Sequence, residues 1–311
     1  MSIEIKEIEY ENYGKCLQMS NRVIDIVVTI DCGPRIIRLG YMNEENVFYN
    51  DLERKYVSQD SKIIERYGKD TAFYCYGGHR VWLYPERMPE TYYPDNDPVV
   101  YGIIPGGVTF TPAKQKHNEM QISMEILMSD GTTDIMVVHS AKNCSKDRQV
   151  CALSAITMMK GGGMEIVPQN RDNNNMLVPN RILTVWPYTD IQDDRISITN
   201  KYVKVRHDSS QEAPLKLGLN NILGCASYYN GDYTVVKRYV HNSFAQYPDC
   251  GCSYETYVCK DYVEMQTLSP LYTLEQGEGI RHVENLSLFK TGSQPLPEED
   301  GAIDKYISCL K

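Results

Sequence analysis

The side chains best suited to acid–base chemistry lie on the segment Asp261 to Leu268, which alternates like a strand. Alternate side chains of a strand point to the same face, so Tyr262, Glu264 and Gln266 share one face and the residues between them share the other. A carboxylate accepts hydroxyl protons, an amide both donates and accepts, and an aromatic ring covers the apolar face of a sugar. This face therefore predicts a site for a polyhydroxylated ligand.

A second group of candidate side chains follows a pair of glycines. Alternation from His79 onward places Arg80, Trp82 and Tyr84 on one face, where rings can stack on a sugar while the guanidinium donates to its hydroxyls. In a strand that starts before it, His79 points the opposite way. The alternative is that the two aromatic residues are core residues and Arg80 reaches out to solvent, and the sequence favours neither interpretation.

Three further candidates are taken as binding residues. Trp186 and Tyr188 flank a proline at the end of a predicted strand, where sandwich proteins commonly place binding groups. Lys216 shares a face with Asn220, opposite three leucines that must face the core. These two polar residues either line a cleft or lie on a plain solvent-exposed surface.

His282 and Glu284 share a face of the last predicted strand and are included among the binding residues. A metal pair is conceivable there, but no linear motif completes a ligand set, so a supporting hydrogen bond or a plain surface is favoured. Cys250 and Cys252 form a close pair that is best explained as part of a turn. We predict no metal site and no cofactor.

Composition restricts the class of protein. The chain has 311 residues, a net charge of −9 and a pI near 5.3, which argues against nucleic-acid binding because that needs clustered Lys and Arg. The charged N-terminal residues lack the apolar core of a signal peptide, and the run Val23 to Ile30 is far too short to span a membrane. We expect a cytoplasmic protein without membrane contact, whose ten cysteines are reduced thiols.

Period-two alternation dominates the sequence, which predicts antiparallel sheets packed face to face in one domain spanning 1–311. The predicted strands are Val23 to Ile30, Arg35 to Tyr41, Arg80 to Tyr84, Met120 to Met128, Asp134 to Ala141, Cys151 to Met158, Arg181 to Trp186, Ser197 to Val205, Leu215 to Asn220, Tyr233 to Tyr239, Ser253 to Cys259, Asp261 to Leu268 and Ile280 to Phe289.

Other segments are less regular. The residues Ser129 to Thr132 predict a hairpin turn, and a short helix is expected between Asp51 and Glu65. Long loops, which are usually either functional or disordered, are predicted at Arg87 to Gly107 and Gly161 to Asn180. The tail 291–311 is expected to pack on the surface with a short helix.

The order of several short motifs resembles the galactose mutarotase-like (aldose 1-epimerase-like) superfamily, in particular a bacterial branch of it. The motifs begin at Gly33, Gly77, Val167, Pro179, Lys216, Tyr247 and Glu264. The resemblance implies a large all-β antiparallel supersandwich with a concave sugar-binding face. It also implies that Glu264 takes the proton from the anomeric hydroxyl, because Glu264, Gln266 and the later Glu278 match the base-bearing segment of that family.

The sequence departs from the family pattern at the general acid. The segment Val185 to Tyr188 corresponds to the place of a family histidine and contains none, so His79 is the candidate acid, ahead of Tyr188 and His282. We therefore expect a saccharide-binding protein with mutarotase-type isomerase chemistry. The alternative is a non-catalytic carbohydrate-binding or sensing protein; a lyase or hydrolase would need an acid–base pair that the sequence does not show. The sugar, its phosphorylation state and the oligomeric state do not follow from the sequence.

Overall fold

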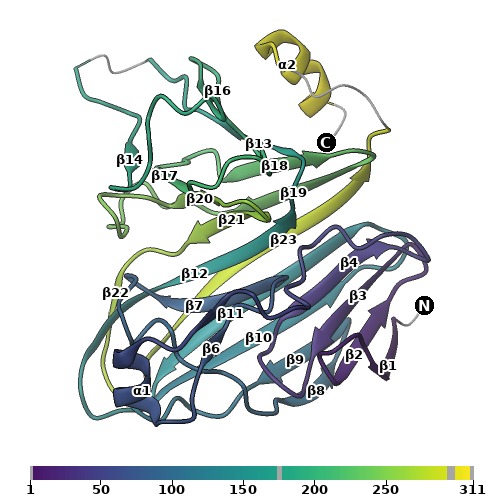
Figure 1. Cartoon of the computed structure of the whole chain (residues 1–311), viewed down its shortest axis with the longest axis vertical. Helices are drawn as coiled ribbons and strands as arrows, with labels where there is room; N and C mark the ends of the chain where they lie inside the picture. The colour runs from purple at the N-terminus through teal and green to yellow at the C-terminus, as the bar shows by residue number, and fades with distance from the viewer. Residues whose placement is uncertain (1–2, 174–176, 293–297, 309–311) are drawn as a thin grey trace.

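Two large antiparallel sheets packed face to face form the body of the computed structural model, which describes residues 3–173, 177–292 and 298–308 (Figure 1). The first sheet has 11 strands, in the spatial order β1 (Glu4–Glu9), β2 (Lys15–Ser20), β3 (Ile24–Thr29), β4 (Ile36–Tyr41), β7 (His79–Tyr84), β12 (Gln149–Lys160), β21 (Tyr262–Leu268), β20 (Tyr254–Val258), β17 (Leu215–Leu219) and β14 (Leu183–Val185), with β22 (Tyr272–Leu274) paired to β12.

The second sheet has 10 strands. Their order is β15 (Ile196–Ile198), β16 (Tyr202–Arg206), β13 (Met164–Pro168), β18 (Cys225–Asn230), β19 (Tyr233–Tyr239), β23 (Gly279–Lys290), β11 (Asp134–Asn143), β10 (Met120–Met128), β9 (Gly107–Thr111) and β8 (Val100–Ile104). A small pair, β5 (Val57–Ser58) and β6 (Phe73–Tyr74), lies beside the large sheets.

The core between the sheets is built from strands with one apolar face each. On β17, Leu215, Leu217 and Leu219 join the main core, while Lys216 between them points to the other face of the first sheet. On β21 the core residues are Val263 and Met265. The alternating polar residues of these strands are thereby held on the face that points away from the second sheet.

The predicted all-β sandwich architecture is confirmed, and each of the predicted strand segments overlaps a strand of the structure. Two predictions need correction. The segment Ser197 to Val205 is the hairpin of β15 and β16, because Thr199 turns the chain back onto Tyr202. The predicted loop Arg87 to Gly107 contains β8, which pairs with β9 across a short turn. The predicted loop Gly161 to Asn180 contains β13, which pairs with β16 and β18, farther along the chain.

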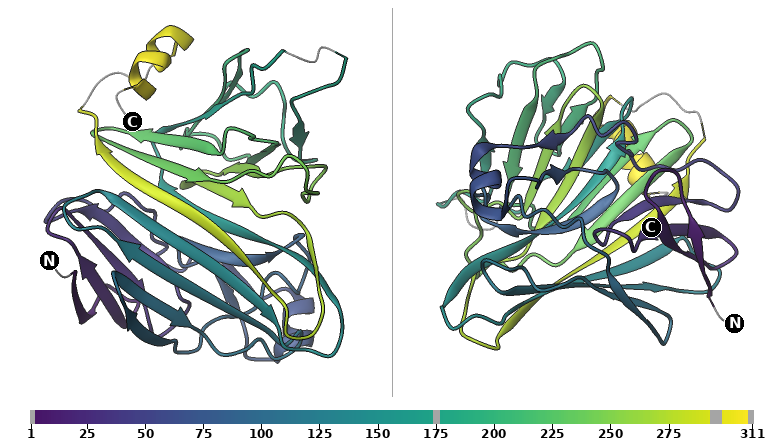
Figure 2. Two further views of the ribbon diagram at one scale, coloured as in Figure 1. Left: turned by 180° about the vertical axis from the view of Figure 1, so that it is seen from behind. Right: turned by 60° about the horizontal axis from the view of Figure 1, so that its bottom comes forward.

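Two helices complete the described chain: α1 (Ser61–Tyr67) and α2 (Asp300–Ser308), which lie at opposite ends of the molecule (Figures 1 and 2). The Asp60 side chain caps α1 by accepting a hydrogen bond from Lys62 N at 2.8 Å. Ile303 of α2 packs against Met164 and Tyr202 of the second sheet. In the part of the chain described here, no helix has both the length and the apolar character needed to cross a membrane.

Candidate functional site

A cavity of about 430 Å³ lies on the first sheet, on the side away from the second sheet. Its floor is formed by β7, β12, β21, β20 and β17, which are adjacent in the sheet. Its walls come from the β5–β6 pair, from the loop after β7 and from Tyr188 and Pro214. The floor therefore displays the outward-facing side chains of the five central strands to a ligand.

Glu264 and Gln266 lie side by side on the floor, as the alternation of β21 predicts, and Tyr262 lines the same cavity. Gln266 Nε2 donates a hydrogen bond to Glu264 Oε2 at 2.5 Å, and the side-chain oxygen of Gln266, Oε1, has no partner among the described residues. Burial raises the pKa of Glu264 to about 7, against the lowering effect of the nearby charges of Lys216 and Arg80. A carboxyl group with this pKa can take up or release a proton near neutral pH.

Arg80 lies on the same floor between two aromatic rings. Its guanidinium carbon is 4.7 Å from the centroid of Phe73 and 4.5 Å from that of Trp82. The side chain is 4% exposed and forms no ion pair within the described chain. The rings hold the guanidinium by cation–π attraction and leave its N–H groups available to a ligand in the cavity.

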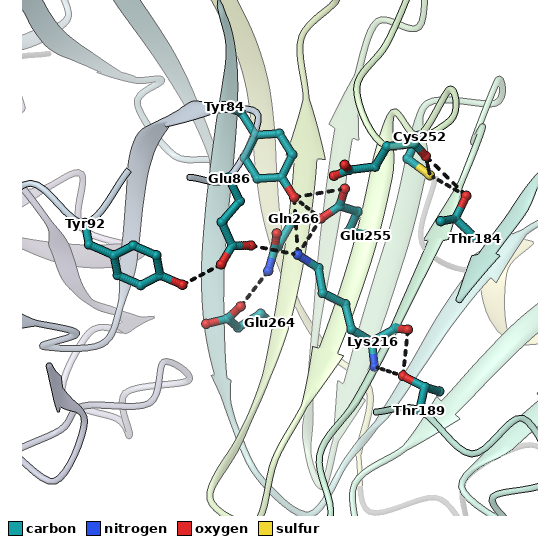
Figure 3. A network of polar contacts seen from close by, with 11 residues as sticks. Tyr84, Glu86, Tyr92, Thr184, Thr189, Lys216, Cys252, Glu255, Glu264 and Gln266 are labelled. Atoms are coloured by element: carbon teal, nitrogen blue, oxygen red, sulfur yellow. Dashed lines mark hydrogen bonds and ion pairs between the residues drawn. The ribbon is translucent and has the colours of Figure 1, made fainter. Parts of the chain in front are cut away.

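Lys216 is the second cation of the cavity and is held by carboxylates (Figure 3). Its Nζ lies 2.8 Å from Glu255 Oε2 and 3.5 Å from Glu86 Oε2, and 3.3 Å from the hydroxyl of Tyr84. Burial opposes the charge of Lys216, but Glu255 and Glu86 outweigh it and raise the pKa of the ammonium above its ordinary value. Lys216 therefore keeps its positive charge at neutral pH.

Three predicted site residues lie elsewhere. His79, His282 and Glu284 are buried between the two sheets and do not line the cavity. His79 precedes Arg80 on β7, so its side chain points to the opposite face, where Nδ1 is 2.9 Å from Thr157 Oγ1. Burial lowers the pKa of His79 well below its usual value, although Glu284 acts in the other direction. The expectation that His79 faces the same ligand as Glu264 is thus corrected by the geometry.

The glycine pair before His79 explains this orientation. Gly78 has φ +71°, and a Cβ atom there would lie 2.2 Å from the carbonyl oxygen of Ile36. Gly77 likewise lies against the Tyr49 carbonyl. The glycines allow the chain to pass close to neighbouring backbone, and they start β7 at His79 with its side chain facing the core.

Trp186 and Tyr188 occupy different positions near the cavity. Tyr188 lines it and is 47% exposed. Trp186 lies behind Lys216, whose Nζ is 4.4 Å from the ring centroid. Trp186 therefore supports the lysine by a cation–π contact rather than forming part of the cavity surface.

Three residues at the site were not predicted from the sequence: Glu86, Tyr92 and Glu255. The Tyr92 hydroxyl donates to Glu86, which in turn faces Lys216 (Figure 3). Tyr92 lies in the long segment after β7 that was predicted to be either functional or disordered, so its region was indicated but not its role. Glu255 carried one signal, because it is the one charged residue of a strand that otherwise consists of Tyr, Thr and Val.

Neither the search against protein-family models nor that against curated proteins gives a match. Solved structures do match. A galactose mutarotase-like protein from Lactobacillus casei is 10% identical with a TM-score of 0.58, covering 88% of this chain and 100% of that one. A galactose mutarotase-like protein from Clostridium acetobutylicum is 13% identical with a TM-score of 0.55, covering 93% and 99%.

A TPR-domain containing protein from Parabacteroides distasonis also matches, at 13% identity and a TM-score of 0.59. The alignment covers 91% of this chain but 48% of that protein, so this chain corresponds to about half of its length. At these identities the similarity concerns the fold.

Proposed function

Because the chain has a galactose mutarotase-like fold, we propose that the cavity on its first sheet binds a saccharide and that Glu264 transfers a proton at the anomeric centre. The observation that carries the proposal is the position of Glu264 on the cavity floor with a pKa of about 7. Catalytic groups work best when their pKa lies near the working pH. Burial also raises the pKa of Glu165 to about 7 and that of Glu255 to about 8, but of these three carboxyl groups Glu264 is the one that lines the cavity.

The size and the lining of the cavity support a sugar ligand. Its volume of about 430 Å³ lies within the range of small-molecule sites. Trp82, Tyr188 and Tyr257 supply ring surface, while Arg80 and Gln266 supply a hydrogen-bond donor and an unsatisfied acceptor. A pyranose has apolar C–H faces and polar hydroxyl groups, and this lining can contact both.

Interconversion of anomers requires a base at O1 and a proton donor at the ring oxygen, each within about 3 Å of its target. Glu264 is the proposed base. Lys216 is proposed to face the ring oxygen, where its ammonium can donate a hydrogen bond and stabilise the negative charge that forms as the ring opens. Arg80 and Gln266 are proposed to orient the hydroxyls.

A non-catalytic saccharide-binding protein is the second candidate. It is favoured by the fact that no histidine lines the cavity within residues 3–173, 177–292 and 298–308. In the proposed mechanism Lys216 takes the place of a histidine as the proton donor. Lys216 is held by two carboxyl groups that raise its pKa, which makes the release of its proton harder.

The two candidates are separated by NMR on a panel of free and phosphorylated aldoses. Ligand-observed saturation transfer reports binding, and exchange spectroscopy between the anomeric protons reports catalysis. Binding together with accelerated exchange supports the isomerase. Binding without acceleration for any sugar supports the binding protein, and the absence of both for every sugar contradicts the saccharide site itself.

A further inference from the structure

A cluster of potential metal ligands lies between the two sheets, separate from the cavity. His79 comes from β7 of the first sheet, and His139 and Glu284 come from the neighbouring strands β11 and β23 of the second sheet. All three residues are 0% exposed. Their potential ligand atoms lie within 4.8 Å of one another. The cluster therefore connects the sheets at the centre of the core.

The distances within the cluster fit a common bound ion. The Nε2 atoms of His79 and His139 are hydrogen-bonded at 2.9 Å, and Glu284 Oε2 is 3.6 Å from the first and 3.7 Å from the second. Imidazole and carboxylate ligands bind Zn²⁺ at about 2.0–2.2 Å, so atoms separated in this way subtend angles of roughly 90–125° at one ion. Such angles bracket the tetrahedral value.

Neighbouring groups orient the ligand atoms of His79 and Glu284, whereas His139 Nδ1 has no hydrogen-bond partner among the described residues. Thr157 Oγ1 is bonded to His79 Nδ1, which leaves Nε2 directed at the cluster. Glu284 Oε1 is taken by Thr267 Oγ1 and by Lys237 Nζ, while Glu284 Oε2 has no hydrogen-bond partner among the described residues. Supporting hydrogen bonds of this kind fix ligands in metal sites. A buried carboxylate oxygen without a partner is otherwise costly.

The charges of the surroundings are compatible with a cation. Lys237 is the ammonium that pairs with Glu284, and it also donates to the carbonyl oxygens of Ala155 and Met265. A second buried carboxyl group, Glu165, interacts electrostatically with Lys237 and accepts hydrogen bonds from Tyr254 and Thr256. With both carboxyl groups ionised and Lys237 charged, the surroundings carry one net negative charge, which offsets half of the charge of a divalent ion.

We propose that His79, His139 and Glu284 form a structural site for a divalent transition-metal ion of the Zn²⁺ type that ties the two sheets together. His282, the cross-strand partner of His139, lies beside the cluster, but its Nε2 is 2.7 Å from Thr267 Oγ1 and it is not one of the three clustered ligands. Zn²⁺ sites that are closed on all sides are structural, whereas catalytic ones keep a position open. The three protein ligands leave a fourth position, but all three are 0% exposed and a substrate cannot reach it, so we assign the site a structural role.

Burial determines how the site must be tested. An ion enters such a site as the chain folds, and it leaves when the chain unfolds rather than by simple dialysis. The full-length protein is therefore expressed in zinc-supplemented medium, gel-filtered, and analysed for metal by mass spectrometry. A second sample is unfolded with a chelator and refolded with Co²⁺, whose visible absorption reports ligand number.

The tested variants are His139→Gln and Glu284→Gln, and the matched control is His117→Gln, because His117 is exposed. We expect stoichiometric metal in wild type and control, a large loss in both cluster variants, and a tetrahedral Co²⁺ spectrum. Metal-free wild type that refolds to the same melting temperature with and without Zn²⁺ would overturn the proposal, as would equal metal in wild type and variants. If the variants fail to fold, the wild-type metal content and Co²⁺ spectrum decide alone.

Discussion

Glu264 and Gln266 are two residues apart on β21, and the amide of Gln266 donates to the carboxyl group of Glu264 at 2.5 Å on the floor of the cavity. The contact fixes one carboxyl oxygen of Glu264. The orientation of its other oxygen toward a ligand then depends on the strand, which is rigid, rather than on a loop. Positioning a reactive group on a strand in this way limits the reorganisation needed during proton transfer.

The pH dependence of the reaction follows from the pKa of Glu264. A general base acts as the carboxylate, so the rate of anomer interconversion is expected to rise between pH 6 and 8 around the pKa of about 7 and to level off above it. The measurement is the NMR exchange rate across this range. A rate that is flat from pH 5 to 8 contradicts the assignment.

The pH dependence of the free energy of unfolding tests the pKa of Glu264 independently of the reaction rate. Because the pKa of Glu264 is higher in the folded state, its contribution is fully present below the unfolded value of about 4.5 and is lost as the pH rises through about 7. Glu264→Gln removes this loss, and the variant is expected to gain on the order of 1–3 kcal/mol over wild type at pH 8. Urea denaturation at pH 5 and pH 8 compares the two proteins.

The ion pair of Lys216 and Glu255 predicts strong coupling between two substitutions. Their charged atoms are 2.8 Å apart, and the side chains are 4% and 0% exposed. Lys216→Met leaves Glu255 buried without its partner. Because burial raises the pKa of Glu255 to about 8 even beside Lys216, the carboxyl group can take up a proton, and the cost is expected to be at most about 3–5 kcal/mol of unfolding free energy. Adding Glu255→Gln removes the titrating group and is expected to restore part of the stability. Additive losses in a urea double-mutant cycle would show that the pair is not coupled.

Arg80→Lys tests the stacked guanidinium. Lysine keeps the charge but lacks the planar group that lies between Phe73 and Trp82, so saccharide affinity is expected to fall by about 0.5–2 kcal/mol. Titration by NMR or calorimetry measures the change. Arg181→Lys is the matched control, because Arg181 is exposed and donates to the Asn170 carbonyl away from the cavity. Equal affinity in all three proteins would remove Arg80 from the binding site.

Gly78→Ala tests the backbone contact that sets the orientation of β7. Gly78 and Gly131 have nearly the same φ, +71° and +72°, but a Cβ at Gly78 meets the Ile36 carbonyl oxygen at 2.2 Å and one at Gly131 meets nothing within 4 Å. Gly131→Ala is expected to cost about 1–2 kcal/mol for the left-handed conformation alone. Gly78→Ala is expected to cost on the order of 4 kcal/mol. Equal losses in thermal or urea unfolding would show that the close contact is unimportant.

The alternation of residue types was sufficient to predict the faces of the central strands. It placed Glu264 and Gln266 together, and Arg80 with Trp82, because a strand has a period of two whatever its partners are. By the same rule His79 points away from Arg80 if it belongs to the strand, and β7 starts at His79. Assigning His79 to the site required it to lie outside the strand, and that prediction was wrong.

Contacts between distant strands could not be obtained from the sequence. Glu255 contacts Lys216 because β20 pairs with β17, and the sequence does not give this order of strands in the sheet. The meeting of His79 with His139 and Glu284 likewise depends on which strands of the two sheets face each other. Short edge strands such as β1 and β8 were missed, since their exposed residues break the apolar alternation.

The central claim is that Glu264 removes the anomeric proton of a bound saccharide. The most direct measurement is the rate at which a freshly dissolved anomer of the sugar that binds reaches equilibrium, followed by NMR with wild type, Glu264→Gln and the exposed-site control Glu9→Gln. The account predicts acceleration by wild type and control, and a loss of about 10²-fold or more in Glu264→Gln with the sugar still bound. Undiminished acceleration in Glu264→Gln would contradict it.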